Sequence, residues 1–182
     1  MHTPSREANL LGVLSLMVSD RVRESVLSGQ QRHESLVAAQ IATCTFLAGG
    51  TIEALSATLG LSHSATVRVV DALEEQGIVE RREASDRRAI AVEPTRRGRR
   101  LTRALLRERE RVLDDILAPL TAPERRIMTA LHERVLFALV AGGAVPQRVC
   151  RMCDMRACGH DEGACPVTNG AKGRRLTEIQ DR

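Results

Sequence analysis

One stretch of the sequence, residues 62–95, constrains the fold of this chain more than any other part. It begins with Ser62, whose hydroxyl can cap the free N–H groups in the first turn of a helix. Gly77 can end that helix, because a left-handed residue costs least there. Between them, apolar residues recur at helical spacing and predict a helix over 63–76 with one buried side: Ala65, Val69, Val70 and Leu73.

A short β-hairpin is predicted directly after this helix. The runs 78–82 and 89–92 are β-prone, and the polar residues 83–88 between them form the loop. The hairpin is also rich in arginine. A helix that offers small polar groups and an arginine, followed by a basic hairpin, is typical of a winged helix-turn-helix that grips DNA.

The distribution of charge favours a nucleic-acid partner. From Arg81 to Arg111 there are twelve arginines and five acidic residues, a local net charge of +7 in a chain whose net charge is +4. A basic block beside such a helix suits a polyanion. The chain has two phenylalanines and no Trp or Tyr, so it lacks the aromatic platforms that bind single strands by base stacking. Double-stranded DNA is therefore the expected partner.

Further helices are predicted on both sides of the 62–95 stretch. A short helix over 52–59, ended by Gly60, completes a helix-turn-helix. Longer apolar stripes predict four more helices: 9–27, 34–48, 95–118 and 123–140. The expected fold is mainly α with a small β-hairpin wing, a winged helix-turn-helix flanked by N- and C-terminal dimerisation helices. A two-fold dimer of this kind would read pseudo-palindromic DNA.

Membrane, secreted and enzymatic functions are disfavoured. No run approaches the ~20 apolar residues of a membrane span, and the first residues lack a signal-peptide pattern, so a cytoplasmic protein is expected. The sequence shows no nucleophile–base constellation, phosphate-binding loop or Gly-x-Ser-x-Gly elbow. An enzyme is therefore not expected.

Four short runs carry a resemblance to a known family. They are LSATLGLSHSATVR over 55–68, LEEQGIVERR over 73–82, DRRAI over 86–90 and TRRG over 95–98. In this order the chain resembles the MarR family of bacterial transcription regulators, over roughly residues 8–140. The resemblance implies a homodimer that binds operator DNA, usually as a repressor. Such proteins often release DNA on sensing a small molecule or an oxidant.

The resemblance also implies which residues contact DNA. The helix over 63–76 would offer four side chains to the major groove: Ser62, Ser64, Thr66 and Arg68. The wing would bring three arginines to the minor groove or its phosphates: Arg82, Arg87 and Arg88. Asp86 would shape the wing by pairing with Arg88 or Arg82, because an acidic residue facing DNA is tolerable only when paired.

Beyond residue 146 the chain departs from this family and carries four cysteines within sixteen residues: Cys150, Cys153, Cys158 and Cys165. Four thiolates at such spacing can hold one tetrahedral Zn²⁺, a structural site that would close one end of the dimer. A four-thiolate set also suits an iron–sulfur cluster that senses oxygen, iron or nitric oxide. Redox-active or metal-free thiols are the third alternative, and a reducing cytoplasm disfavours disulfides.

The expected organisation has three parts. Residues 8–140 form the regulator domain with its DNA-binding core over 51–95, residues 146–167 form the cysteine motif, and residues 168–182 form a disordered tail. The leading hypothesis is a regulator, most simply a repressor, whose DNA affinity is tuned by a small ligand or by the metal or redox state of the cysteines. The alternative is a dimeric metal- or redox-binding interaction protein with no operator function.

Overall fold

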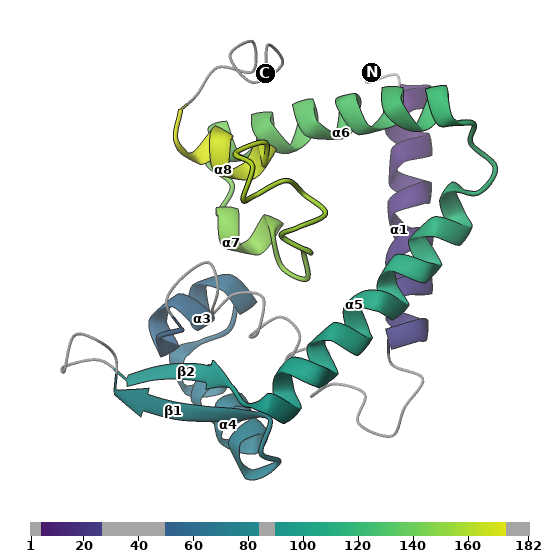
Figure 1. Cartoon of the computed structure of the whole chain (residues 1–182). Coiled ribbons are helices and arrows are strands. Elements are labelled where there is room, and N and C mark those ends of the chain that lie inside the picture. The colour runs from purple at the N-terminus through teal and green to yellow at the C-terminus, as the bar shows by residue number, and fades with distance from the viewer. Residues whose placement is uncertain (1–4, 27–49, 84–89, 174–182) are drawn as a thin grey trace.

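The structure, a computed structural model, describes residues 5–26, 50–83 and 90–173 (Figure 1). Three long helices form its frame: α1 (Arg6–Val26), α5 (Arg96–Leu117) and α6 (Ala122–Ala141). A compact unit at one end of α5 holds the shorter elements: α3 (Ile52–Leu59), α4 (His63–Glu75), β1 (Val79–Glu83) and β2 (Ile90–Pro94). Two short helices follow the frame: α7 (Pro146–Val149) and α8 (Pro166–Ala171). The predicted mainly helical fold with a hairpin wing is confirmed.

Two sequence expectations concern residues that the structure does not describe. The predicted helix over 34–48 and most of the predicted wing loop lie outside the described residues. Among the helices that are described, none is long and apolar enough to cross a membrane.

Local capping sets the ends of the helix-turn-helix. The Thr51 hydroxyl accepts a hydrogen bond from the Ala54 N–H at 3.2 Å and begins α3. Gly60 ends that helix in the left-handed region, with φ of +68°. The Ser62 hydroxyl then accepts a hydrogen bond from the Ala65 N–H at 3.3 Å and begins α4. The helix boundaries predicted from these residues are confirmed.

One apolar core joins the two helices of this unit to its hairpin. Its fully buried side chains come from α3, α4 and both sides of the hairpin: Leu55, Val70, Leu73, Ile78, Val79 and Val92. Leu101 of α5 packs against them. Each such side chain contributes about 1.5–3 kcal/mol relative to an exposed one. The unit therefore holds its helices and hairpin in one fixed arrangement.

The hairpin pairs antiparallel, with Val79 opposite Pro94 and Glu83 opposite Ile90. Its second strand also meets the backbone before α3, because the Val92 N–H donates to the Gly50 carbonyl at 2.8 Å. The predicted strands are confirmed, although β2 lies one to two residues later than expected. This extra pairing fixes the wing to the start of α3.

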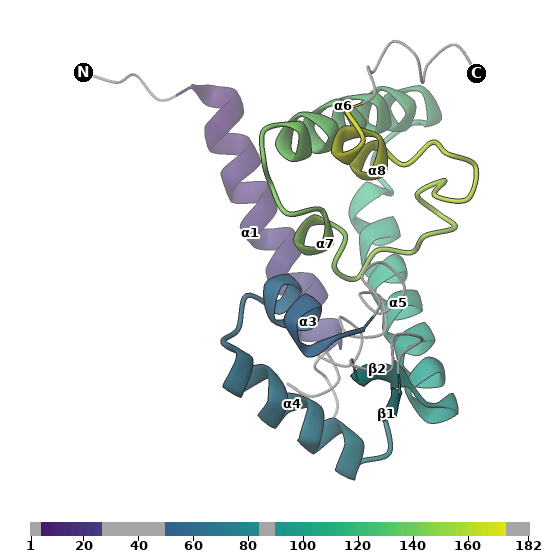
Figure 2. The ribbon, with the colours of Figure 1, turned by 90° about the vertical axis from the view of Figure 1, so that its left-hand side faces the viewer.

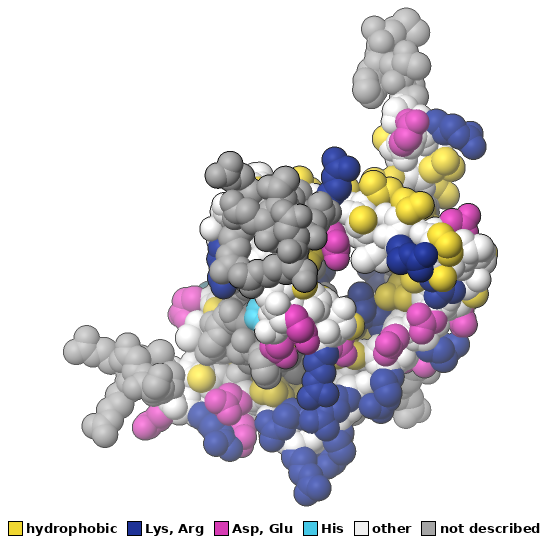
Figure 3. Space-filling model, turned by 45° about the horizontal axis from the view of Figure 1, so that its top comes forward, with side chains coloured by type: hydrophobic (Ala, Val, Ile, Leu, Met, Phe, Trp, Pro, Cys, Tyr) yellow, Lys and Arg dark blue, Asp and Glu magenta, His cyan; other side chains and the backbone are white. Residues whose placement is uncertain are grey.

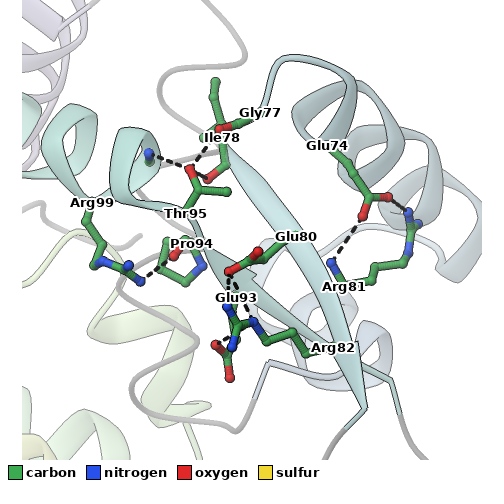
Figure 4. Close-up of polar contacts among 11 residues, drawn as sticks. Glu74, Gly77, Ile78, Glu80, Arg81, Arg82, Glu93, Pro94, Thr95 and Arg99 are labelled. Atoms are coloured by element: carbon green, nitrogen blue, oxygen red, sulfur yellow. Dashed lines mark hydrogen bonds and ion pairs between the residues drawn. The ribbon is translucent and has the colours of Figure 1, made fainter.

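The junction between the hairpin and α5 explains the TRRG run. The Thr95 hydroxyl caps α5 by accepting from the Gly98 N–H at 3.1 Å, and it donates to the Gly77 carbonyl at 2.7 Å (Figure 4). Gly98 is buried against the Ile78 carbonyl oxygen, which would lie only 2.1 Å from an added Cβ. α5 therefore starts in direct backbone contact with the turn that follows α4.

Replacing Gly98 by alanine is expected to destabilise the protein by about 2 kcal/mol, because backbone atoms must move to admit the methyl group. The measurement is thermal unfolding followed by far-UV circular dichroism. Arg100→Ala is the matched control, since Arg100 is exposed on the same helix. Equal melting temperatures for the two variants would contradict the close approach seen at Ile78.

α1 and α5 lie side by side and are linked by a polar contact (Figures 1 and 2). The Ser25 hydroxyl donates to the Glu108 carboxylate, which also accepts from Arg111. The hydrogen bonds from Arg111 and Ser25 lower the pKa of Glu108 to about 2. The ionised carboxylate is therefore favoured in the folded chain.

This contact predicts a pH dependence. Because the pKa of Glu108 is lower when folded than when unfolded, its stabilisation is present above the unfolded pKa and disappears as pH falls toward 2. Glu108→Gln should lower the melting temperature at pH 7, and the difference from the wild type should shrink between pH 5 and pH 2. Glu110→Gln, at an exposed position two residues on, serves as control. A difference that stays constant with pH would contradict the assignment.

α6 leaves its apolar stripe uncovered. It begins at a capping box of Thr121 and Glu124, and hydrogen bonds to Thr121 lower the pKa of the Glu124 carboxylate. The expected burial of this stripe is not reached within one chain, because its large side chains are exposed: Ile127, Leu131, Val135 and Leu139. α1 is similarly exposed at Leu10, Leu11, Leu14 and Met17.

The expected disordered tail over 168–182 is wrong for its first residues. α8 continues to Ala171, and Asn169 within it is fully buried and donates to the Gly163 carbonyl at 2.9 Å. Gly170 lies against the Phe137 backbone, so α8 packs closely on α6. α8 contains few apolar residues, so its sequence pattern did not predict a buried helix. Residues 174–182 lie outside the described part of the chain.

Candidate nucleic-acid interface

The outer side of α4 carries three of the four side chains predicted to enter the major groove. Ser62, Ser64 and Arg68 are all exposed. The hydroxyls of Ser62 and Ser64 lie 3.3 Å apart at the start of the helix. Within the described residues the Arg68 guanidinium makes no ion pair, so its donors are available to an external acceptor.

The fourth prediction, that Thr66 contacts DNA, is wrong. Thr66 is fully buried between α3 and α4, where it accepts a hydrogen bond from the Ser56 hydroxyl at 3.0 Å. Its own hydroxyl donates to the Ser62 carbonyl at 3.0 Å. Two residues along a helix turn a side chain by about 200°, so Thr66 faces away from the side that Ser64 occupies. It joins the two helices instead of reading bases.

The wing residues divide between the hairpin and the loop at its tip. Arg82 is exposed on β1 and pairs with Glu80 at 2.8 Å and with Glu93 at 3.8 Å (Figure 4). The other predicted wing residues, Asp86, Arg87 and Arg88, lie outside the described residues. Arg82 is therefore positioned by hairpin carboxylates, and exposed pairs of this type are weak enough to exchange for a phosphate.

Arg81, the neighbour of Arg82, faces the opposite side of the strand and holds the wing to α4. Its guanidinium binds Asp71 at 2.6 Å and also pairs with Glu74, whose carboxylate accepts the Arg81 N–H at 3.1 Å. The hydrogen bond to Asp71 raises the pKa of Arg81, burial opposes that rise, and Glu74 adds to it. Arg81 thus fixes the angle between the hairpin and the helix that would enter DNA.

The start of α5 adds a basic surface that was not singled out residue by residue from the sequence. Its first turns contain no acidic residue and several exposed arginines: Arg96, Arg97, Arg99, Arg100 and Arg103. Cations at a helix N-terminus oppose the helix dipole. Arg97 and Arg99 donate to the backbone carbonyls of Gln76 and Pro94, so local structure explains only part of the cluster. A basic surface gathers where α5 begins (Figure 3), at the same end of the molecule as α4 and the hairpin (Figures 1 and 2). An arginine cluster in a first helical turn is the signal that identifies it.

A groove of about 310 Å³ lies between α1, α5 and the segment after α7. Its walls are apolar at Val18, Val22, Leu113 and Met152. Three arginines from distant parts of the sequence also line it: Arg23, Arg109 and Arg151. Sequence spacing gives no signal for this meeting, because the three residues belong to three different segments.

The four cysteines lie in one cluster between α6, α7 and α8. Cys150 and Cys165 are buried with Val140 and Val167, and Cys153 and Cys158 pack against them. All four are thiols and not disulfides. Across residues 5–26, 50–83 and 90–173, however, no three Cys, His, Asp or Glu side chains are grouped closely enough to hold a metal ion as the chain stands.

The apolar core that joins α3, α4 and the hairpin, the capped helices and the exposed basic surface together define a winged helix-turn-helix protein. Residues 48–89 match the sequence model described as MarR family, and solved structures similar to the fold include proteins described as MarR family. Over these residues the chain is similar to the MarR family. No curated protein matches the sequence.

Three solved structures illustrate the similarity. A MarR family protein from Bacillus stearothermophilus has 24% identity and a TM-score of 0.57, over 70% of this chain and 91% of that one. CouR from Rhodococcus jostii RHA1, bound to p-coumaroyl-CoA, has 25% identity and a TM-score of 0.54, over 72% and 92%. MepR from Staphylococcus aureus, in complex with DNA, has 14% identity and a TM-score of 0.54, over 74% and 96%.

Proposed function

We propose that this chain is a transcription regulator, most simply a repressor, that binds double-stranded DNA sequence-specifically as a homodimer. The observation that carries the proposal is the common placement of α4 and the α5 arginines at one end of the molecule. α4 presents Ser64 and Arg68 on a rigid, capped helix, and the arginines supply positive charge beside it. Side chains of the helix can contact base edges, while the surrounding charge binds phosphates. Binding of DNA requires the chain to be where DNA is, in the cytoplasm, and requires no catalytic group.

The uncovered faces of α1 and α6 support the homodimer. A regular stripe of two exposed leucines, a valine and an isoleucine on α6 is too large to remain in water on a monomer. Pairing with a second copy covers the stripe and places two copies of α4 about one helical turn of DNA apart. The expected operator is therefore pseudo-palindromic.

The groove between α1 and α5 supports modulation by a small ligand. Apolar walls with three arginines suit an amphipathic anion, a molecule with an apolar body and a carboxylate or phosphate group. The groove lies between α1 and α5, and α5 begins directly after the wing. A ligand there would change the DNA affinity by altering how α1 meets α5.

The test is binding of the full-length chain to the DNA upstream of its own gene, measured by fluorescence anisotropy against unrelated DNA of equal length. We expect tighter binding to the upstream fragment, and binding that weakens as salt rises because phosphates are neutralised. Equal affinity for both fragments would overturn sequence-specific regulation. It would favour the alternative of a dimeric metal- or redox-binding interaction protein.

A further inference from the structure

The segment that holds the four cysteines connects parts of the molecule that are distant in sequence. α8 packs on α6, which carries the exposed dimer stripe. α7 contacts α3. The Arg148 guanidinium packs so closely on Gly60 that a Cβ added to this glycine would lie only 2.1 Å from the guanidinium. Met152 is buried with Val26 of α1 and Leu105 of α5. The segment therefore reaches the dimer helices and the helix-turn-helix at once.

The first pair of cysteines is brought together by a sharp turn. The Cys153 N–H donates to the Cys150 carbonyl at 2.9 Å. Between them Met152 adopts φ of +63°, a left-handed conformation that is unfavourable for a residue with a side chain. Burial of its side chain in the α1–α5 core offsets that cost. The turn thus presents Cys150 and Cys153 to the interior of the segment.

The second pair reaches the same place through turns and α8. The Asp154 carboxylate accepts the Arg156 N–H at 2.9 Å and shapes the turn before Cys158, and Cys165 sits at the start of α8. The Cys158 thiol is within hydrogen-bonding reach of both Cys153 and Cys165. Cys158 therefore lies between Cys153 and Cys165, and Cys150 belongs to the same buried cluster.

The thiols of this cluster differ in their readiness to ionise. Burial, followed by the neighbouring thiols, raises the pKa of Cys158, and burial also raises the pKa of Cys153. Burial opposes ionisation of Cys165 as well, but hydrogen bonds from the Thr168 hydroxyl and from the N–H groups of Thr168 and Val167 lower its pKa.

We propose that Cys150, Cys153, Cys158 and Cys165 together bind one Zn²⁺ ion, and that the ion fixes the 146–171 segment as a strap between α6 and α3. The donor set fits the ion, because four cysteine thiolates form the closed, tetrahedral coordination of structural zinc. Zn–S bonds are about 2.3 Å long, so the sulfurs draw together when the ion binds. The four cysteines are separated by short turns and by no long helix, so the chain holds the four thiols in one half-buried cluster.

The direct test is the metal content of full-length protein purified anaerobically under reducing conditions. We expect elemental analysis to find one zinc per chain. Four thiols should react with a thiol reagent only after a chelator has removed the zinc. Cys153→Ser and Cys158→Ser, at half-buried positions where folding is least at risk, should each lower the zinc retained against a chromogenic chelator at least tenfold. His160→Ala is the control and should retain zinc, because the His160 imidazole faces the Thr168 hydroxyl at 3.2 Å.

Other outcomes overturn the proposal. Iron with acid-labile sulfide in a brown sample would replace zinc with an iron–sulfur cluster, and metal-free protein with fully reactive thiols would make the cluster a thiol site. Zinc retained by both serine variants would place the ion elsewhere.

A second measurement on the wild type tests the strap without any substitution. Removing zinc and restoring Zn²⁺ alone should raise and then lower amide hydrogen exchange around Gly60 and the end of α3, where Arg148 lies. Exchange there that ignores zinc would overturn the strap. Neither measurement uses DNA, so each can fail while the proposed regulator function stands.

Discussion

Arg68→Ala is expected to weaken binding to the proposed operator about 10–100-fold relative to the wild type. Arg68 is exposed on α4 and makes no ion pair in the described part of the chain, so the substitution removes little besides its contact with DNA. A guanidinium contact to a base or phosphate is worth about 1–3 kcal/mol. The loss is measured by anisotropy titration at fixed salt.

The salt dependence of the same variant identifies the partner of Arg68. A lost phosphate contact weakens binding to all sequences and lowers the salt slope by about one per site, whereas a lost base contact relaxes preference at one operator position. Arg156→Ala, an exposed arginine of the cysteine segment, is the matched control and should bind as the wild type does. Unchanged operator affinity for Arg68→Ala would remove α4 as the reading helix.

Two charges placed in the apolar stripe of α6 are expected to separate the proposed dimer. Leu131 and Val135 are 52% and 54% exposed in the single chain, one helical turn apart. Leu131→Glu with Val135→Glu should raise the dimer dissociation constant at least 100-fold, because buried anchors at interfaces are worth about 2 kcal/mol or more each. Operator affinity should fall in parallel, since a monomer contacts one half-site.

The substituted side chains make few contacts within their own chain, so the far-UV circular dichroism of this variant should match that of the wild type. The oligomeric state is measured by analytical ultracentrifugation. Arg126→Glu is the control, because Arg126 is exposed on the other side of α6. A double variant that remains dimeric would show that the stripe has another partner.

Most of the local architecture could be predicted from the sequence. Thr51, Ser62 and Thr95 begin their helices through hydroxyl caps, and Gly60 and Gly77 lie in the left-handed region as their positions indicated. Each of these interactions joins residues three or four positions apart, so residue types and their spacing in the sequence can predict it. The TRRG run also has a local signal, although its reason, the contact of Gly98 with Ile78, is visible only in the folded chain.

The candidate site was predictable in part. Ser64 and Arg68 share a helical side and are exposed together, whereas the resemblance to the family assigned Thr66 to DNA without regard to its angle on the helix. Arg81 and Arg82 are the same residue type, but successive residues of a strand face opposite sides. Arg81 therefore pairs with Asp71 of α4, whereas Arg82 pairs with Glu80 within the hairpin. Helical and strand geometry decided each case.

The sequence by itself determined the helices and strands of the helix-turn-helix and its hairpin, the long helices α1, α5 and α6, and that a basic reading unit lies between apolar helices, whereas the short helices α7 and α8 were not predicted. Only the tertiary structure decided which distant residues meet. It brought Arg23, Arg109 and Arg151 to one groove, gathered four cysteines into one cluster and set their segment against both α6 and α3. The physical reason is range: caps and periodicity act over one helical turn, whereas these meetings depend on how whole elements pack, which no short run of residues encodes.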